Sequence, residues 1–202
     1  FFDGFRTSHE YQKVEAMDME DLRPLVDYKA LQEFRERALS PMRPEMKGMA
    51  ENPDVFFAHR ESCNRYYDAV PDIVSDYMKE ISKITGREYR PFNYYGAPDA
   101  ENIIICMGSA CEAIREVIDY EAAKGNKKLG LINVHLYRPF SLKYLKEALP
   151  ASVKRICVLD RTKEPGANGE PLYLDVKDAL DELGLKDLLV VGGRYGLGSN
   201  DT

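Results

Sequence analysis

The second half of the chain alternates apolar runs with amphipathic segments. Four runs rich in Ile, Leu and Val predict β-strands at residues 102–107, 129–136, 153–159 and 188–191. Helical spacing between them predicts helices at residues 110–124, 142–149 and 172–183. In the first of these helices, Ala113, Val117 and Ile118 are expected to face inward. Near-continuous apolar strands separated by helices indicate an α/β fold, with a mostly parallel sheet flanked by helices on both faces.

The first half is charged and interrupted by prolines. Residues 28–39 predict an amphipathic helix that ends at Ser40, because the residue before a proline avoids helical geometry. Residues 46–60 are expected to form an irregular connector. Residues 61–84 predict a second helix, which Pro71 can interrupt. A boundary near residues 89–98 then separates a helical, irregular N-terminal arm from the α/β domain.

Composition narrows the class of partner. The chain has 202 residues and a formal net charge of −6, so nucleic acid and anionic membrane surfaces would repel it. No apolar run approaches the roughly 20 residues of a membrane helix, and no signal-peptide pattern is present. We therefore expect a cytoplasmic protein.

Cysteine and histidine spacing predicts no metal site. Cys63, Cys106, Cys111 and Cys157 form no CxxC pair, and Cys106 and Cys157 lie in apolar runs, where a thiol behaves as a small hydrophobe. We expect free thiols in a reducing compartment, without disulfides. His9 follows Ser8 and precedes Glu10, but a catalytic triad is assembled in space rather than in sequence. A structural or interface role is favoured for His9.

The segment after the third predicted strand carries the candidate site. Residues 161–171 contain prolines, glycines and charges, and carboxyl ends of parallel strands are where α/β proteins place ligand and partner contacts. Arg161 and Lys163 could hold an anionic group, while Glu164 would weaken that field. Asn168 completes the polar set. The structural alternative is a loop that its prolines and glycines merely shape.

Two glycine-containing segments are weaker candidates. Residues 107–110 join a strand to a helix, but only Gly108 of a dinucleotide fingerprint is present, which favours a structural turn. Residues 193–198 carry Arg194 among glycines, with no helix after them, which favours a mobile exit segment. The chain begins with Phe1 and stops in this glycine-rich stretch, so we expect it to be a piece of a longer polypeptide.

Seven phrases in order resemble one family, pyruvate:ferredoxin (flavodoxin) oxidoreductase, over nearly the whole chain. They lie at residues 2–10 (FDGFRTSHE), 52–57 (NPDVFF), 63–71 (CNRYYDAVP), 94–100 (YYGAPDA), 107–111 (MGSAC), 136–141 (LYRPFS) and 159–173. The resemblance implies that residues 1–95 are the tail of a preceding domain plus a helical linker arm. It also implies that residues 96–198 are a domain similar to the C-terminal domain of transketolase.

The resemblance implies an activity for the parent enzyme. That family oxidatively decarboxylates pyruvate on thiamine diphosphate with magnesium, passes electrons through iron–sulfur clusters to ferredoxin or flavodoxin, and forms acetyl-coenzyme A. The family's catalytic and cofactor residues lie outside this window, and none here matches a catalytic motif. We expect a catalytically inactive scaffold piece of a homodimeric parent, whose other domains it contacts. Residues Arg161, Lys163, Glu164, Asn168 and Arg194 are expected on an interdomain contact or the coenzyme A path.

Two other classes remain open. A free-standing small-molecule-binding α/β module would need an intact phosphate loop. An interaction module would use the N-terminal arm as its docking element, and would leave apolar side chains exposed at Phe56, Phe57, Ile73 and Tyr77.

Overall fold

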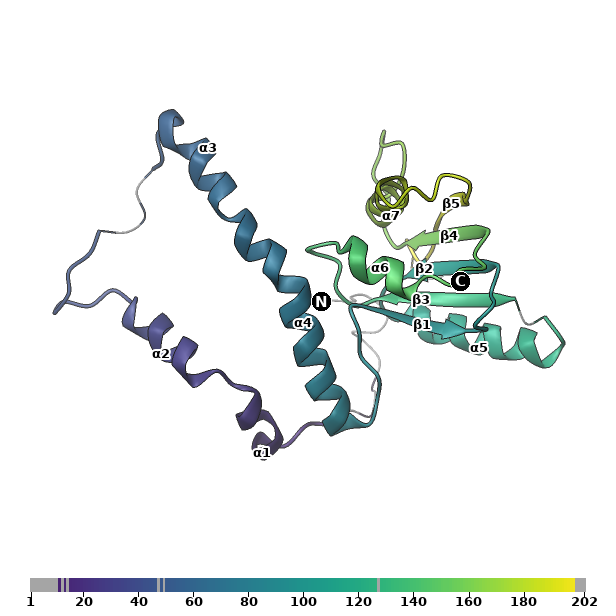
Figure 1. The fold of residues 1–202 in the computed structure, drawn as a ribbon, viewed down its shortest axis with the longest axis horizontal. Helices are drawn as coiled ribbons and strands as arrows, with labels where there is room; N and C mark the ends of the chain where they lie inside the picture. Colours follow the sequence, from purple (N-terminus) through teal and green to yellow (C-terminus); the bar gives the residue numbers. More distant parts are fainter. Residues whose placement is uncertain are drawn as a thin grey trace. The chain divides into compact units, whose positions relative to one another are not determined.

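The structure is a computed structural model that describes residues 11, 13, 15–46, 48, 50–126 and 128–198. The chain divides into two units, one of residues Lys13–Gly86 and one that contains the chain from Arg87 onward. Figure 1 shows the first unit as separate helices and the second as a sheet with helices packed on it. The phrase at residues 2–10, with His9, lies outside the described residues.

The first unit is helical, as its sequence predicts. It contains α1 (Met19–Leu22), the 3-10 helix η2 (Arg23–Leu25), α2 (Tyr28–Glu36), α3 (Pro53–Ser62) and α4 (Asn64–Thr85). The Asp27 carboxylate accepts a hydrogen bond of 2.9 Å from the Ala30 N–H, which satisfies one of the free donors at the start of α2. At the other end of the unit, Gly86 adopts φ 70° and terminates α4.

Two expectations for this unit were wrong. Residues 46–60 are not all irregular, because α3 starts at Pro53, in the first helical turn where proline's fixed φ and missing N–H are tolerated. Pro71 does not interrupt α4, which continues through it to Thr85. Asn52-Pro53 is a pair well suited to open a helix, with Asn52 at the N-cap position and Pro53 in the first turn.

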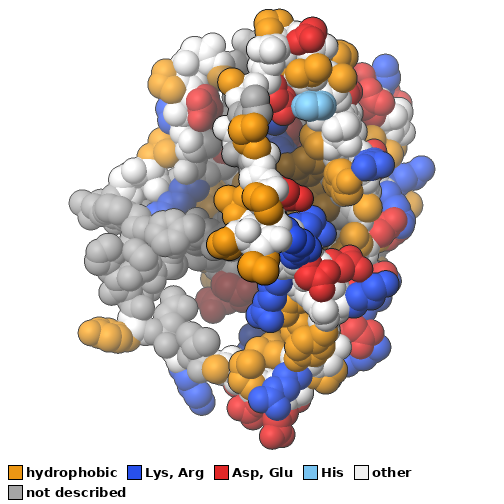
Figure 2. Space-filling view, turned by 90° about the vertical axis from the view of Figure 1, so that its left-hand side faces the viewer, with side chains coloured by type: hydrophobic (Ala, Val, Ile, Leu, Met, Phe, Trp, Pro, Cys, Tyr) orange, Lys and Arg blue, Asp and Glu red, His pale blue; other side chains and the backbone are white. Residues whose placement is uncertain are grey.

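Apolar side chains are exposed along α3 and α4. The exposed fractions are 53% for Phe56, 75% for Phe57, 51% for Ile73 and 42% for Tyr77, which confirms the expectation for these residues. Figure 2 views this side of the molecule and shows hydrophobic side chains spread over its surface among charged ones. Among the described helices, none is both long and apolar enough to cross a membrane.

The second unit is an α/β sheet. Its elements are β1 (Phe92–Gly96), β2 (Asn102–Cys106), α5 (Ala110–Ala123), β3 (Leu129–Val134), α6 (Leu142–Ala148), β4 (Arg155–Asp160), α7 (Pro171–Glu182) and β5 (Leu189–Arg194). The strand order is β1-β3-β2-β4-β5, and the last four strands in sequence pair in parallel. The predicted α/β fold with a mostly parallel sheet is confirmed.

Strand β1 was missed. It pairs antiparallel with β3, with Phe92 opposite Val134 and Gly96 opposite Gly130. Tyr94 packs against the main core and Tyr95 against the cluster on the α5 side, so both side chains belong to the sheet. The strand has five residues, starts after a proline and ends in a glycine, and with polar Asn93 among them it shows too little alternation to be predicted.

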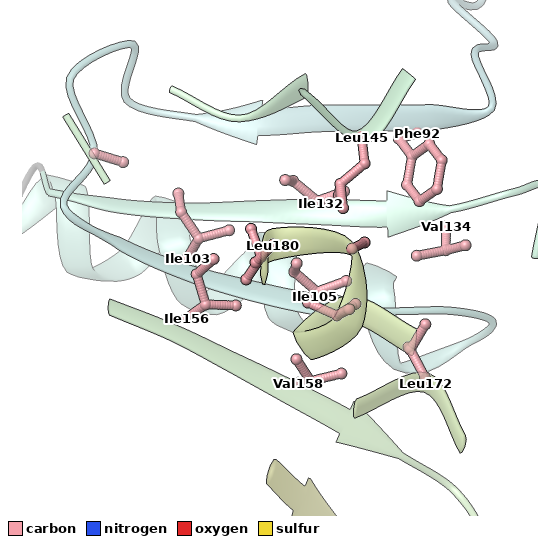
Figure 3. Close-up of a cluster of buried hydrophobic side chains, with 13 residues drawn as sticks. Phe92, Ile103, Ile105, Ile132, Val134, Leu145, Ile156, Val158, Leu172 and Leu180 are labelled. Carbon is pink, nitrogen blue, oxygen red and sulfur yellow. The ribbon is translucent and has the colours of Figure 1, made fainter. Parts of the chain in front are cut away.

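The two faces of the sheet are covered unequally. Helices α6 and α7 pack on one face over the main core, which includes fully buried Ile105, Leu145, Val158, Leu172 and Val176. Figure 3 shows Ile105, Val158 and Leu172 of this core where α7 lies over the sheet. Helix α5 packs on the other face over a smaller cluster of Cys106, Cys111, Ile118 and Leu131. Ile118 is therefore buried as expected, whereas Ala113 and Val117 are exposed.

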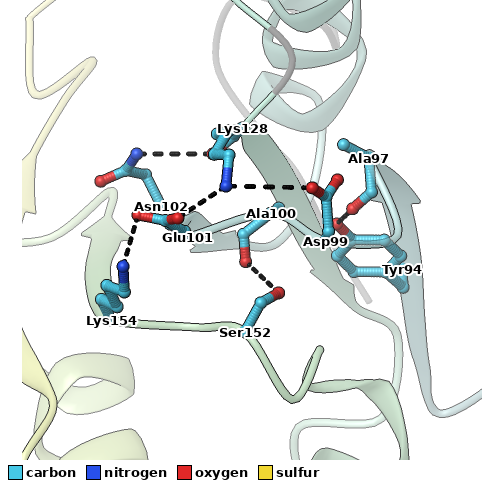
Figure 4. A network of polar contacts seen from close by, with 9 residues as sticks. All are labelled: Tyr94, Ala97, Asp99, Ala100, Glu101, Asn102, Lys128, Ser152 and Lys154. Carbon is cyan, nitrogen blue, oxygen red and sulfur yellow. Dashed lines mark hydrogen bonds and ion pairs between the residues drawn. The ribbon is translucent and has the colours of Figure 1, made fainter.

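A polar network closes the amino edge of the parallel strands (Figure 4). The Glu101 carboxylate lies 2.7 Å from Lys128 Nζ and 2.9 Å from Lys154 Nζ. These lysines, Lys128 first, lower the pKa of Glu101 to about 2. Ser152 Oγ donates a hydrogen bond of 2.8 Å to the Ala100 carbonyl. The segments before β2, β3 and β4 are thus tied together at this edge.

The start of β1 and the end of β5 both lie at the opposite, carboxyl edge of the sheet. Phe92 at the start of β1 pairs with Val134 at the end of β3. Arg194 at the end of β5 pairs with Asp160 at the end of β4. The chain therefore enters β1 and leaves β5 at the same edge of the sheet, and this edge also carries the candidate loop.

Candidate functional site

The candidate loop begins at a buried carboxylate. Asp160, the last residue of β4, is 3% exposed. Its Oδ1 accepts from the Leu172 N–H at 2.9 Å and its Oδ2 from the Tyr173 N–H at 3.1 Å. Burial raises the pKa of Asp160, while these two hydrogen bonds oppose the shift. Asp160 thus caps the N-terminus of α7 from the strand that precedes the loop.

A second carboxylate, Glu170, organises the loop itself. Its side chain is 5% exposed and lies 2.9 Å from Arg194 Nη1 and 3.6 Å from Lys163 Nζ. It also accepts a hydrogen bond of 2.7 Å from the Glu164 N–H. Burial alone would raise the pKa of Glu170, but the Glu164 N–H and the two cations hold it below its usual value. The carboxylate joins both ends of the loop to β5.

The segment after β5 folds back over the strand ends. The Tyr195 N–H donates to the Asp160 carbonyl at 3.2 Å, and the Tyr195 hydroxyl donates to the Met107 carbonyl at 3.3 Å. Arg161 Nε donates to the Gly196 carbonyl at 3.0 Å. Residues 195 and 196 therefore bridge the ends of β2 and β4. In this strand order, that position is the topological switch point, where open α/β sheets bind ligands.

Four of the five predicted site residues come together. Arg161, Lys163, Glu164 and Arg194 join Asp160, Glu170 and Tyr195 in a single group, here called the strand-end cluster. Asn168 is exposed on the same loop, and within the described part of the chain it makes no hydrogen bond to this group.

Three members of the cluster were missed by sequence reasoning. Asp160, Glu170 and Tyr195 make most of its contacts, although the cations drew attention first. Glu170 had a detectable signal, because it precedes Pro171 at the start of α7, which is the N-cap position. Asp160 could also have been noticed as a carboxylate that ends a buried strand. Tyr195 carried no sequence signal for its contacts with residues 107 and 160.

The chemistry of the cluster is that of a closed network. Lys163 and Arg194 both face Glu170, and Arg161 already donates to a backbone carbonyl. Paired cations attract an additional anion less strongly than unpaired ones. The cluster therefore joins β4, α7 and the exit segment, and it leaves little unpaired positive charge for an anionic ligand.

A smaller polar group lies on the adjacent segment after β3. The Tyr137 hydroxyl donates to Asp175 Oδ2 at 2.6 Å, and Arg138 Nη2 donates to the same oxygen at 2.7 Å. The guanidinium of Arg138 stacks 4.0 Å from the centroid of the Tyr137 ring. Burial, followed by the hydrogen bond to Asp175, raises the pKa of Tyr137 to about 12. These contacts attach the segment after β3 to α7.

Among the described cysteines and histidines, Cys106 contacts the strand-end cluster through Tyr195, whose hydroxyl lies 3.8 Å from its Sγ. All four cysteines are free thiols, with Cys106 and Cys111 buried. The hydrogen bond to Cys106, together with burial, raises the pKa of Cys111, so this thiol stays protonated. His59 Nδ1 lies 2.9 Å from Glu51 Oε1, and His135 Nδ1 lies 3.0 Å from the Arg90 carbonyl oxygen. Among the described residues, no three His, Cys, Asp or Glu side chains are grouped as a metal site requires.

Two family models match the chain. Residues 100–201 match the model described as pyruvate:ferredoxin oxidoreductase core domain II. Residues 1–79 match the model described as pyruvate flavodoxin/ferredoxin oxidoreductase, thiamine diphosphate-binding. The first match covers the sheet from the start of β2 onward, together with the strand-end cluster.

Curated relatives match over the full chain. It is 56% identical over 201 residues to pyruvate:ferredoxin oxidoreductase of Moorella thermoacetica and 56% identical over 201 residues to pyruvate-flavodoxin oxidoreductase of Enterobacter agglomerans. It is 48% identical over 203 residues to pyruvate dehydrogenase [NADP(+)] of Cryptosporidium parvum. All of this chain is covered each time, but it spans only 17%, 17% and 10% of those relatives.

One solved structure also resembles the chain, though weakly. It is 2-oxoglutarate:ferredoxin oxidoreductase from Magnetococcus marinus, with a TM-score of 0.42 and 16% sequence identity. The likeness covers 76% of this chain and 24% of that one.

Proposed function

The chain belongs to the pyruvate:ferredoxin oxidoreductase core domain II family, and from this premise we propose that it is a scaffold module of a larger 2-oxo acid oxidoreductase. One observation carries the proposal: Tyr195 occupies the switch point of the sheet, where a ligand-binding α/β module would keep an open crevice. The strand-end cluster supports the same role, because its charges are used to join elements of the chain.

We propose that the intact enzyme oxidatively decarboxylates pyruvate and passes electrons to ferredoxin or flavodoxin, with acetyl-coenzyme A as product. The names of the Moorella and Enterobacter relatives support this substrate and these acceptors. The Cryptosporidium relative is named for NADP⁺ instead, although it is 48% identical to this chain. A similar module thus occurs with different acceptors, which favours a role other than acceptor choice.

The cofactors of such an enzyme would be bound outside the described part of this chain. Thiamine diphosphate with magnesium and iron–sulfur clusters are the groups that the family implies. An iron–sulfur cluster site needs several convergent thiolates, whereas Cys106 of β2 and Cys111 of α5 are buried in the smaller apolar cluster, and among the described residues no group of three possible metal ligands forms. These two thiols alone do not fit an iron–sulfur cluster. We propose that a homodimeric, cytoplasmic parent supplies the sites from its other parts.

Binding and activity measurements on the chain and on the intact enzyme test the scaffold role. Isothermal titration of the purified chain with coenzyme A or thiamine diphosphate should give no saturable heat, and the chain should not consume pyruvate. The intact enzyme should catalyse pyruvate- and coenzyme A-dependent reduction of ferredoxin or flavodoxin. Saturable binding to the chain that Arg161→Ala and Lys163→Ala abolish would replace the scaffold role with a ligand site.

The strand-end cluster offers a finer proposal for the intact enzyme. Arg161, Lys163, Glu164, Asn168 and Arg194 either contact a neighbouring domain or line the path of coenzyme A. With Arg161→Ala and Lys163→Ala combined, a higher apparent KM for coenzyme A would indicate the path. An unchanged KM with weakened assembly would indicate the interdomain contact. Unchanged kinetics and assembly would refute both. Lys186→Ala, an exposed site on the same unit, is the control.

A second candidate role is an interaction module that docks through the helical arm. The exposed Phe56, Phe57, Ile73 and Tyr77 favour it. Concentration-dependent association in analytical ultracentrifugation, lost on Phe57→Ser with Ile73→Ser, would support this role. A monomer at high concentration would count against it.

A further inference from the structure

An apolar groove lies beside α5 on the sheet face opposite α6 and α7. Its volume is about 350 Å³. The walls include Ile104 of β2, Val117 of α5, Cys157 of β4 and Val191 of β5, and Arg155 lies at one end. It is built wholly within the α/β unit, whereas the strand-end cluster lies at the carboxyl edge of the sheet.

The groove exists because α5 covers only part of this face. Helix α5 packs over β3 and β1, whereas β4 and β5 lie beyond it. Cys157 pairs with Val191, and Arg155 pairs with Leu189, so these side chains point to the same face. Leu189 is 58% exposed, Val191 47% and Val117 55%. Apolar side chains of a helix and of two strands thus converge on a surface that no described element covers.

The sequence of these strands is typical of burial on both faces. Residues 156–159 and 188–191 are continuous apolar runs, as in strands covered by a layer on each side. The apolar stripe of α5 likewise continues through Ala113 and Val117. The sequence predicts that these two side chains face inward, but in the structure they line the groove and are exposed. Among the described elements, none forms a second layer over β4 and β5 on this face.

The dimensions suit a single helix. Neighbouring strands are spaced by about 4.8 Å, so the bare strip over two strands is about 10 Å wide, close to the diameter of one α-helix. A second copy of this chain would present the same hollow, and two hollows in an isologous contact would leave each other unfilled.

We propose that the groove is the docking site for one amphipathic helix from the part of the intact enzyme that lies outside these 202 residues. The inference rests on the proposed function, which makes this chain a module of a larger enzyme. The relatives are long enough to supply such a helix, because this sequence covers only 17% of their length. The helix presents apolar side chains at i, i+3 or i+4 and i+7 to Val117, Cys157 and Val191. A carboxylate at one end of the helix pairs with Arg155, whose Nη1 also donates a hydrogen bond of 3.1 Å to Asn102 Oδ1.

Thiol labelling of the intact enzyme tests the proposal. Cys157 is a natural thiol in the groove wall, and Val191→Cys adds a second. In the native enzyme, both should react with a maleimide at least about tenfold more slowly than in urea, because thiol reactivity follows access. Tyr120→Cys, on the exposed side of α5, serves as the reference for an open site. Labelling of Cys157 and Val191→Cys at their unfolded rates would overturn the proposal.

Cross-linking identifies the occupant. A photoreactive diazirine amino acid in place of Val191 inserts into a bond of the neighbouring segment on irradiation, and peptide mapping of enzyme assembled from ¹⁴N- and ¹⁵N-labelled chains identifies the linked peptide. A linked helical peptide of the same chain, outside these 202 residues, supports the proposal. A peptide from a second copy or from an unrelated protein refutes it.

The same preparation separates this inference from the proposed function. Pyruvate- and coenzyme A-dependent reduction of ferredoxin is measured before labelling. Absence of this activity would overturn the proposed function. In that case, slow labelling of the groove thiols together with a cross-link to the same chain would still support the groove proposal. Activity with unprotected thiols would overturn the groove proposal alone.

Discussion

The Arg194 guanidinium lies 2.9 Å from the buried Glu170 carboxylate, and this ion pair joins the end of β5 to the start of α7. Glu170 also accepts the Glu164 N–H, so a single side chain connects a strand, a loop and a helix. Removal of a cation leaves the buried Glu170 carboxylate with one partner fewer, whereas Lys163 and Arg194 are themselves about half exposed.

Glu170→Gln should therefore lower the thermal unfolding midpoint of the chain. The amide keeps the shape and one acceptor but loses both charge interactions. Arg194→Ala in the Glu170→Gln background should cause a smaller further change than Arg194→Ala alone, because the pair is already broken. Glu182→Gln, a charge loss elsewhere on α7, is the control. Equal effects of Glu170→Gln and the control, by differential scanning calorimetry, would contradict the assignment.

Asp160→Ala should cost about 1–3 kcal/mol, because the Leu172 and Tyr173 N–H groups lose their acceptor. Asp160→Asn should cost less, since its carbonyl oxygen still accepts and no buried charge remains. The pKa of Asp160 is raised, so its ionised form opposes folding and the cost of Asp160→Asn should shrink as pH increases. Urea unfolding followed by circular dichroism measures the differences. A larger cost for Asp160→Asn than for Asp160→Ala would argue against capping.

The carboxylate of Glu101 makes stability depend on acid pH. Its pKa is lowered to about 2 by Lys128 and Lys154. A carboxyl group whose pKa is lower in the folded chain than in the unfolded chain stabilises the fold. This stabilisation is fully present above the unfolded-state pKa and is lost as the pH falls to the folded-state pKa. Stability should thus decline between about pH 4.5 and pH 2, and Glu101→Gln should flatten that part of the profile. An unchanged slope in urea titrations across this range would remove Glu101 as a cause.

Gly96→Ala should destabilise the chain more than Gly125→Ala. Both glycines have positive φ, 125° and 97°. A Cβ at residue 96 would lie 2.5 Å from the Leu129 carbonyl oxygen, whereas, among the described residues, a Cβ at residue 125 would point into open space. Gly125→Ala should cost about 1–3 kcal/mol for backbone strain, and Gly96→Ala more, because β1 must move away from β3. Similar costs in urea unfolding would mean that the edge strand yields easily.

Periodicity predicted the parallel core because burial on both faces leaves a strong apolar signature. Ile103, Ile105, Ile156 and Val158 belong to such runs. β1 was missed because an antiparallel edge strand has no such run. The helix over residues 53–62 was missed because Asn52-Pro53 is compatible with both a loop and a helix start.

The candidate site was predicted in part for a related reason. The position of a loop after a strand follows from the chain order, so Arg161 and Lys163 were found. Their partners depend on distances across the sheet, which sequence order does not reveal. Tyr195 contacts Met107 from 88 residues away, and Glu170 reaches Arg194 over 24 residues. The predicted cations therefore turned out to be paired within the chain.

The shared edge at which the chain enters β1 and leaves β5 makes this sheet a spacer. Four strand intervals of about 4.8 Å separate those two strands, so the incoming and outgoing backbone are held about 19 Å apart. That separation is set by backbone hydrogen bonds rather than by side chains, and surface substitutions should leave it unchanged. The backbone that enters β1 and the backbone that leaves β5 are consequently held at a distance that the sheet itself sets.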